Sequence, residues 1–230
     1  MVFLFLLAGN GSFSTSNSPA ELRKPEQATE NHLVELELSF AYFDQPKPAE
    51  NLSISFQPPH LRNMVYQNPL IISGGKVSVE QLTDFLWIHN KGIHRNYAFQ
   101  IADLYVKEAM AEGVNHDIAF CQMCLETGFL RYGGVVRPEQ FNYCGLGAVS
   151  DFEEGLYFES PAEGIRAHIQ HLKAYASEDS LRRTLIDKRF NYVKRGSAVV
   201  IDQLTGKWAT DPKYGKKIRS LLRRLHLFVG

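Results

Sequence analysis

Residues 160–176 read SPAEGIRAHIQHLKAYA, and this stretch contains the clearest helix start in the chain. Ser160 suits the N-cap, Pro161 suits the first helical position, and Glu163 suits the third, where its side chain can bond back to the cap. The apolar residues that follow recur at spacings of three and four: Ala162, Ile165, Ile169, Leu172 and Ala176. This spacing predicts an amphipathic helix with one face buried in a core.

Helical patterns also precede this stretch. Ser78 can cap a first helix, and a second is expected over about 96–111. A third begins near Asn115 or Asp117 and runs to Glu126, where the glycine that follows favours an end. Three helices therefore come before the helix that starts at Ser160.

Toward the C-terminus, two short helical segments are expected, followed by a last helix capped by Asp211 with Pro212 at its first position. Residues 129–159, rich in glycine and tyrosine, are interpreted as a loop or hairpin insertion. The patterns predict one mainly helical domain over residues 76–230.

In the N-terminal third, apolar residues repeat at a different spacing from that of a helix. Residues 34–42 and 52–56 alternate between apolar and polar side chains, as half-buried strands do. We therefore expect residues 20–75 to form a strand-containing extension. Residues 1–19 are interpreted as an export signal and linker, because a short apolar run precedes Ser- and Asn-rich residues.

No Lys or Arg precedes that apolar run, so a frayed tail is the alternative to a signal. The run is too short to span a membrane as a helix. We expect an exported protein of the periplasm or cell surface, without an integral membrane segment.

The charges of the chain balance, with 25 Lys and Arg against 25 Asp and Glu. This balance gives no overall attraction to nucleic acid or to an anionic membrane. It fits a polymer that is recognised through hydroxyl and acetamide groups. The basic residues from Lys216 to Arg224 are interpreted as the solvated face of an amphipathic helix.

The chain has three cysteines, Cys121, Cys124 and Cys144, so a complete set of disulfides is excluded. The first two lie in an apolar helical pattern, which favours buried small apolar residues; one disulfide to Cys144 is the alternative. No second CxxC and no His pair with ligand spacing accompanies them. We expect no metal and no organic cofactor.

Glu126 has the setting of a general acid. A carboxyl group that donates a proton to a glycosidic oxygen needs a raised pKa, which a partly apolar pocket provides. Apolar residues precede Glu126 and a glycine follows closely, so it lies at a helix C-terminus that opens into a loop. The negative end of the helix dipole also opposes ionisation. The alternative is a solvated glutamate in a last helical turn.

Four ordered segments resemble one family. Residues 122–129 (QMCLETGF) resemble the motif in which E-[ST]-G closes a helix in glycoside hydrolase family seventy-three. Residues 141–148 (FNYCGLGA) resemble the cleft-lining Asn-aromatic-x-Gly segment of that family. Residues 159–168 (ESPAEGIRAH) resemble its helix that carries the motif EG-[IV]-RAH. Residues 204–215 (LTGKWATDPKYG) resemble its WA-x-DP-x-YG signature. The resemblance covers about 78–226.

The resemblance implies a mainly α (α+β) fold of the lysozyme-like type, in which a helical domain with a cleft carries a small hairpin or loop lobe. It implies endo-β-N-acetylglucosaminidase activity on peptidoglycan glycan strands. Glu126 takes the position of the acid, and Tyr214 that of a tyrosine near the active site. A core role for the Tyr214 ring is the alternative.

The second catalytic carboxylate is open. Asp151, Glu153, Glu154 and Glu159 all lie in the expected smaller lobe, where many family members place a glutamate on a hairpin. We take Asp151 and Glu154 as candidates for the base or nucleophile. The acetamide of the substrate is the alternative nucleophile, and it would make a second carboxylate unnecessary.

The substrate-binding candidates come from the same motifs and from irregular stretches beside Glu126, where an aromatic ring is more often functional. They are Gln122, Tyr132, Asn142, Tyr143, Gly145 and Trp208. Trp208 can stack on a sugar ring, or it can be a core tryptophan.

Three other functions compete with a glucosaminidase. A lytic transglycosylase also uses one acidic glutamate, but it leaves anhydro-muramyl ends. A non-catalytic wall-binding module would have an inert cleft. A structural or secretion-scaffold role rests only on the unexplained extension.

Overall fold

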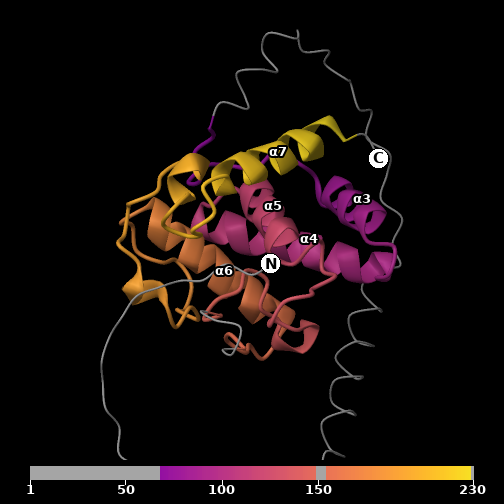
Figure 1. Cartoon of the computed structure of the whole chain (residues 1–230), viewed down its shortest axis with the longest axis horizontal. Helices are drawn as coiled ribbons and strands as arrows, with labels where there is room; N and C mark the ends of the chain where they lie inside the picture. Colours follow the sequence, from indigo (N-terminus) through magenta and orange to yellow (C-terminus); the bar gives the residue numbers. More distant parts are fainter. Residues whose placement is uncertain (1–67, 149–153, 229–230) are drawn as a thin grey trace, which may run out of the picture. The chain divides into compact units, whose positions relative to one another are not determined.

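The computed structural model describes residues 68–148 and 154–228 of the chain, and within them the fold is mainly helical (Figure 1). The long helices are α3 (Val79–His89), α4 (Arg95–Glu112), α5 (His116–Glu126), α6 (Pro161–Ala176) and α7 (Tyr214–Leu227). Three short 3-10 helices, η1 (Pro138–Gln140), η2 (Phe190–Tyr192) and η3 (Ile201–Leu204), lie in the connections. The mainly α fold class is confirmed.

The helix starts follow the capping residues read from the sequence, with one exception. The Ser160 hydroxyl accepts from the Glu163 amide at 3.3 Å, and Ser78 and Asn115 cap α3 and α5 in the same way. The exception is α7, which begins at Tyr214 rather than at Pro212. Its expected cap, Asp211, instead accepts from the Lys213 amide at 2.9 Å and forms a turn ahead of the helix.

Helix α5 is the centre of the core. It packs against α4, α6 and α7, and Figure 1 shows it surrounded by them. Nine consecutive residues, His116–Cys124, are buried. Cys121, Cys124 and Cys144 are all free and buried, so the interpretation as small apolar core residues is confirmed over a disulfide.

The segment 129–159 is a loop in its described part. It contains η1 but no strand, so the loop alternative holds over a hairpin for the described residues. The chain just before α3 packs on the helical domain: Ile71 is fully buried, and its amide donates to the Val199 carbonyl at 3.0 Å. The expected strands at 34–42 and 52–56 and the export signal at 1–19 lie outside the described residues.

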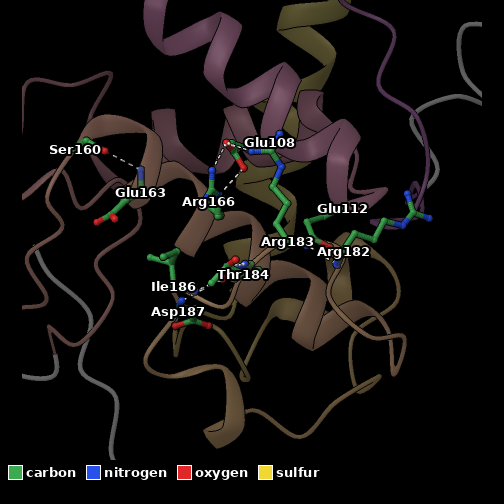
Figure 2. A network of polar contacts seen from close by, with 11 residues as sticks. Glu108, Glu112, Ser160, Glu163, Arg166, Arg182, Arg183, Thr184, Ile186 and Asp187 are labelled. Carbon is green, nitrogen blue, oxygen red and sulfur yellow. Dashed lines mark hydrogen bonds and ion pairs between the residues drawn. The ribbon is translucent and has the colours of Figure 1, made fainter. Parts of the chain in front are cut away.

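A buried ionic cluster fastens the chain after α6 onto the helices, as Figure 2 shows. The Glu112 carboxylate of α4 accepts from the Lys173 ammonium of α6 at 2.8 Å. It also accepts from the backbone amides of Arg182 and Arg183 at 3.0 and 2.9 Å. One carboxylate thus joins two helices and the connecting segment.

Two neighbouring residues continue this cluster (Figure 2). Glu108 holds the Arg166 guanidinium through bonds of 2.9 and 3.1 Å. Gln170 donates to the Thr184 carbonyl and accepts from the Ile186 amide, both at 2.8 Å. The segment is therefore held to α6 at several points along its length.

The described part of the chain contains no helix that is both long and apolar enough to cross a membrane.

Glu112→Gln is expected to lower the free energy of unfolding by about 3 kcal/mol, because it leaves the buried Lys173 ammonium without a counter-charge. Urea denaturation followed by circular dichroism measures the change. Glu178→Gln, an exposed acid of the same segment, is the control and should stay within about 0.5 kcal/mol of the unchanged protein. Equal stabilities for Glu112→Gln and the control would contradict the role of the cluster.

Candidate active site

A pocket of about 430 Å³ opens beside the end of α5. Four segments contribute to its walls: residues 125–128, loop 132–136, loop 142–148 and the stretch 208–217. Segments far apart in the sequence therefore meet here, and Glu126, Trp208 and Tyr214 are among the lining residues.

The end of α5 directs Glu126 into this pocket. Thr127 closes the helix, and its hydroxyl donates to the Met123 carbonyl at 2.8 Å. Gly128 adopts a left-handed conformation with φ of 60°, and the Phe129 amide donates back to the Cys124 carbonyl at 2.9 Å. This is a Schellman-type ending, which a glycine accommodates without strain. It explains the E-T-G order at this point.

Glu126 combines access to the pocket with an enclosed carboxyl group. The residue is exposed and lines the pocket, and the surrounding protein desolvates its carboxyl group. This desolvation raises the pKa of Glu126 to about 7, although hydrogen bonds from Tyr214 and Trp208 act in the opposite direction. The Tyr214 hydroxyl donates to Glu126 Oε1 at 2.5 Å. The carboxyl group can therefore hold a proton near neutral pH and release it.

Tyr214 and Gln122 lie behind Glu126. Tyr214 is 3% exposed, and its hydroxyl oxygen accepts from Gln122 Nε2 at 2.7 Å. Gln122 is fully buried, so it reaches the pocket only through Tyr214. Both alternatives for Tyr214 thus apply, since its ring is in the core and its hydroxyl contacts the candidate acid.

Trp208 is mainly a core residue. It is 3% exposed and packs against the rings of His168, His171 and Tyr175, with centroid distances of 5.7, 5.0 and 5.5 Å. Trp208 also lines the pocket, and its side chain acts to lower the pKa of Glu126. Its packing leaves little of the ring for a sugar, so the core interpretation is favoured over a stacking platform.

The remaining substrate-binding candidates divide into two groups. Tyr132, Asn142 and Gly145 line the pocket. Tyr143 does not: it is 0% exposed and its hydroxyl lies 3.3 Å from that of Tyr97. The direct sugar contact expected for Tyr143 therefore has no accessible side chain to make it.

Asn142 shapes the wall of the pocket. Its amide accepts from the Leu146 amide at 2.9 Å and donates to the carbonyls of Leu146 and Leu156 at 2.8 and 3.1 Å. The loop also packs closely against the first turn of α6. A Cβ at Gly164 would be 1.7 Å from the Phe141 carbonyl oxygen, so only glycine allows this approach. Asn142 and Gly164 thus fix the loop from two sides.

The two described candidates for a second carboxylate, Glu154 and Glu159, do not line the pocket that contains Glu126. Asp151 and Glu153 lie outside the described residues. Glu154 and Glu159 are exposed, and the Glu154 carboxylate accepts from the Tyr157 hydroxyl at 2.8 Å.

Asp211 and Lys217 line the pocket and were not predicted as site residues. Their side chains form an ion pair at 2.5 Å, and the hydrogen bond from Lys217 is the main reason that the pKa of Asp211 is lowered. Asp211 was interpreted only as a helix cap. Its position between Trp208 and Tyr214, three residues from each, was the signal that could have found it.

Among the described residues, no three His, Cys, Asp or Glu side chains gather as metal ligands.

One family model matches more than half of the chain. Residues 102–227 match the family model described as mannosyl-glycoprotein endo-beta-N-acetylglucosaminidase. A protein of Borreliella burgdorferi described as uncharacterized is 46% identical over 157 residues, which are 68% of this chain and 77% of that protein. A structure of S. aureus autolysin E in complex with the muropeptide NAM-L-Ala-D-iGlu aligns with 77% of this chain and 82% of that one, at 15% identity and a TM-score of 0.45.

Tyr214→Phe is expected to raise the pKa of Glu126 by about one unit from its value of about 7. The change removes a donor that favours the ionised carboxylate, so the proton is held to higher pH. A carbon-13 NMR titration of the glutamate carboxyl groups, assigned with Glu126→Gln, measures the shift. Tyr97→Phe removes a hydroxyl outside this site and is the control; a Tyr214→Phe curve equal to the control would refute the contact.

Proposed function

Because the chain belongs to the mannosyl-glycoprotein endo-beta-N-acetylglucosaminidase family, we propose that it is a peptidoglycan hydrolase. We propose that it cleaves the β-1,4 bond on the reducing side of N-acetylglucosamine in the glycan strand. Glu126 is the general acid in this proposal. The observation that carries it is a carboxyl group at the rim of a pocket with a pKa near 7 and a hydroxyl donor on one oxygen.

The geometry supports a proton transfer from Glu126 to the leaving oxygen. At pH 7 a group with a pKa of about 7 is protonated in about half of the molecules. After the transfer, the new carboxylate accepts from the Tyr214 hydroxyl, which is already in place, and Trp208 also favours the ionised form. Cleavage should therefore weaken as the pH rises above about 7.

The pocket residues favour the acetamide of the substrate as the nucleophile that attacks the anomeric carbon while Glu126 protonates the leaving oxygen. Water then hydrolyses the cyclic intermediate, giving its hydroxyl to the sugar and a proton back to Glu126. Neither described acid of the smaller lobe, Glu154 or Glu159, lines the pocket. Asp211 does line it, but Lys217 already pairs with its carboxylate. An acetamide on the sugar itself needs no second carboxylate. Asp151 and Glu154 remain the protein alternatives.

This function places the protein outside the cytoplasm, where the glycan strands are, in agreement with the signal-like apolar run at the start of the sequence. The neutral charge balance suits a substrate recognised through hydroxyl and amide groups.

Glu126→Gln is expected to reduce cleavage of purified peptidoglycan by at least about 100-fold, because the amide keeps the shape but has no transferable proton. Mass spectrometry of the released fragments should show reducing N-acetylglucosamine ends for the unchanged protein. Anhydro-muramyl ends would instead identify a lytic transglycosylase. Binding without any cleavage by the unchanged protein would identify a wall-binding module.

Single changes of Asp151, Glu153, Glu154, Glu159 and Asp211 to alanine are each expected to reduce cleavage less than Glu126→Gln does. The reason is that an acetamide nucleophile leaves no second carboxylate indispensable. Initial rates on the same peptidoglycan, with folding checked by circular dichroism, give the ranking. One alanine variant as inactive as Glu126→Gln would show that a protein carboxylate is the base or nucleophile.

A further inference from the structure

A row of four hydrogen bonds leads from the core to the candidate acid and joins five side chains. The Tyr105 hydroxyl of α4 lies 2.9 Å from His168 Nδ1 of α6. His168 Nε2 lies 3.1 Å from Gln122 Oε1 of α5. Gln122 Nε2 then donates to the Tyr214 oxygen at 2.7 Å, and Tyr214 donates to Glu126 Oε1 at 2.5 Å. We call these five residues the Tyr105–Glu126 network.

The donor and the acceptor of each bond in the network can be assigned, because the role of one atom fixes the role of the next. Gln122 Oε1 can only accept, so His168 Nε2 must carry the hydrogen. His168 Nδ1 then accepts, and the Tyr105 hydroxyl donates to it. At the other end, the Tyr214 oxygen is occupied by the Gln122 amide, which leaves its hydrogen for Glu126.

We propose that His168 is a positioning residue for the acid: its Nε2–H holds the Gln122 amide in the orientation that makes Tyr214 a donor to Glu126. The proposal rests on the function proposed for Glu126. In the opposite orientation Gln122 would present its oxygen to Tyr214. Tyr214 would then donate to Gln122 and could no longer donate to Glu126.

The orientation decides where Glu126 carries its proton. While Tyr214 donates to Oε1, that oxygen is an acceptor, and the transferable proton belongs on Oε2. The donor also favours the ionised product of the transfer. Reversal of the Gln122 amide would remove both effects and leave the acid with a higher pKa.

The surroundings of His168 suit a fixed, neutral ring. Burial, the larger effect, and the nearby His171 lower the pKa of His168 to about 3, so the imidazole carries one hydrogen at any working pH. Burial keeps the pKa of Tyr105 well above its usual value, so that hydroxyl always has a hydrogen to donate. Tyr105 packs edge-on against Phe120 and His168, which holds its hydroxyl in place.

The other groups that face Glu126 come from different elements and do not take part. Asp211 and Lys217 line the same pocket as an ion pair, and the buried Cys144 thiol lies near the carboxyl group. None of them contacts His168 through a bond of the network. The Trp208 ring also packs against His168, with a centroid distance of 5.7 Å, and acts on the pKa of Glu126. His168→Met and His168→Gln both remove the imidazole from this packing, so a difference between the two variants reports on the route through Gln122 and Tyr214.

The test compares His168→Met with His168→Gln, two unbranched side chains of similar size. Methionine offers only a weak sulfur acceptor, so it favours the reversed Gln122 amide. Glutamine still offers an N–H to Gln122. In a carbon-13 titration of the Glu126 carboxyl, His168→Met should raise the pKa by about half a unit to one unit. His168→Gln should stay close to the unchanged protein, as should the Tyr97→Phe control.

A nitrogen-15 NMR spectrum of the unchanged protein supplies a measurement that needs no variant. We expect His168 to carry its hydrogen on Nε2, and a hydrogen on Nδ1 would overturn the proposal. A folded His168→Met with the Glu126 pKa of the unchanged protein would also overturn it. Both measurements work without substrate. If His168→Met shifts the pKa of Glu126 but the unchanged protein cuts no glycan, only the proposed function is refuted. If the unchanged protein cuts glycan but His168→Met leaves the pKa of Glu126 unshifted, only the role of His168 is refuted.

Discussion

The burial of α5 is the constraint on which the rest of the described structure depends. Neighbours cover this helix so completely that nine consecutive residues have no significant contact with solvent. Buried polar groups are costly unless they are hydrogen-bonded, so each polar residue of α5 must find a partner on another element. Among the polar residues of the helix are Asp117 near its start, Gln122 in the middle and Glu126 at its end, where the carboxyl group is desolvated.

Each of these polar groups joins α5 to different parts of the fold. The Asp117 carboxylate accepts from the Lys76 amide at 3.0 Å and from His226 of α7 at 2.8 Å. It thereby ties the chain before α3 and the C-terminal helix to the core. Gln122 joins α6 to α7 through His168 and Tyr214. The polar bonds of one helix thus set the relative positions of its neighbours.

Desolvation acts to raise the pKa of both carboxyl groups, and the partners of each group decide the net result. Burial acts to raise the pKa of Asp117, but two histidines and a backbone amide keep it lowered. Glu126 has only the neutral donors Tyr214 and Trp208, so the pKa stays raised. Asp117 is therefore a structural anion, and Glu126 is the carboxyl group that can exchange a proton near neutral pH.

Features set by local chemistry could be predicted from the sequence. The Ser160 cap, the end of α5 at Gly128 and the position of Glu126 depend on residues within one or two turns of each other, so the order of residue types was enough. The motif resemblance likewise predicted the family. The start of α7 was displaced by two residues because the Asp211 carboxylate could serve equally as a helix cap or as part of a turn.

Features set by contacts between distant segments could not be predicted. Whether Tyr143 faces a sugar or the core depends on Tyr97 and Tyr105, which lie about forty residues earlier in the sequence. From the sequence, Trp208 was equally suited to stacking on a sugar ring and to packing in the core. Three rings of α6 pack against it and favour the core role. The sequence by itself determined which residue is the candidate acid and how the helix that carries it ends. Only the tertiary structure decided which groups hold its proton, because hydrogen bonds across α4, α5, α6 and α7 depend on distances that no local pattern encodes.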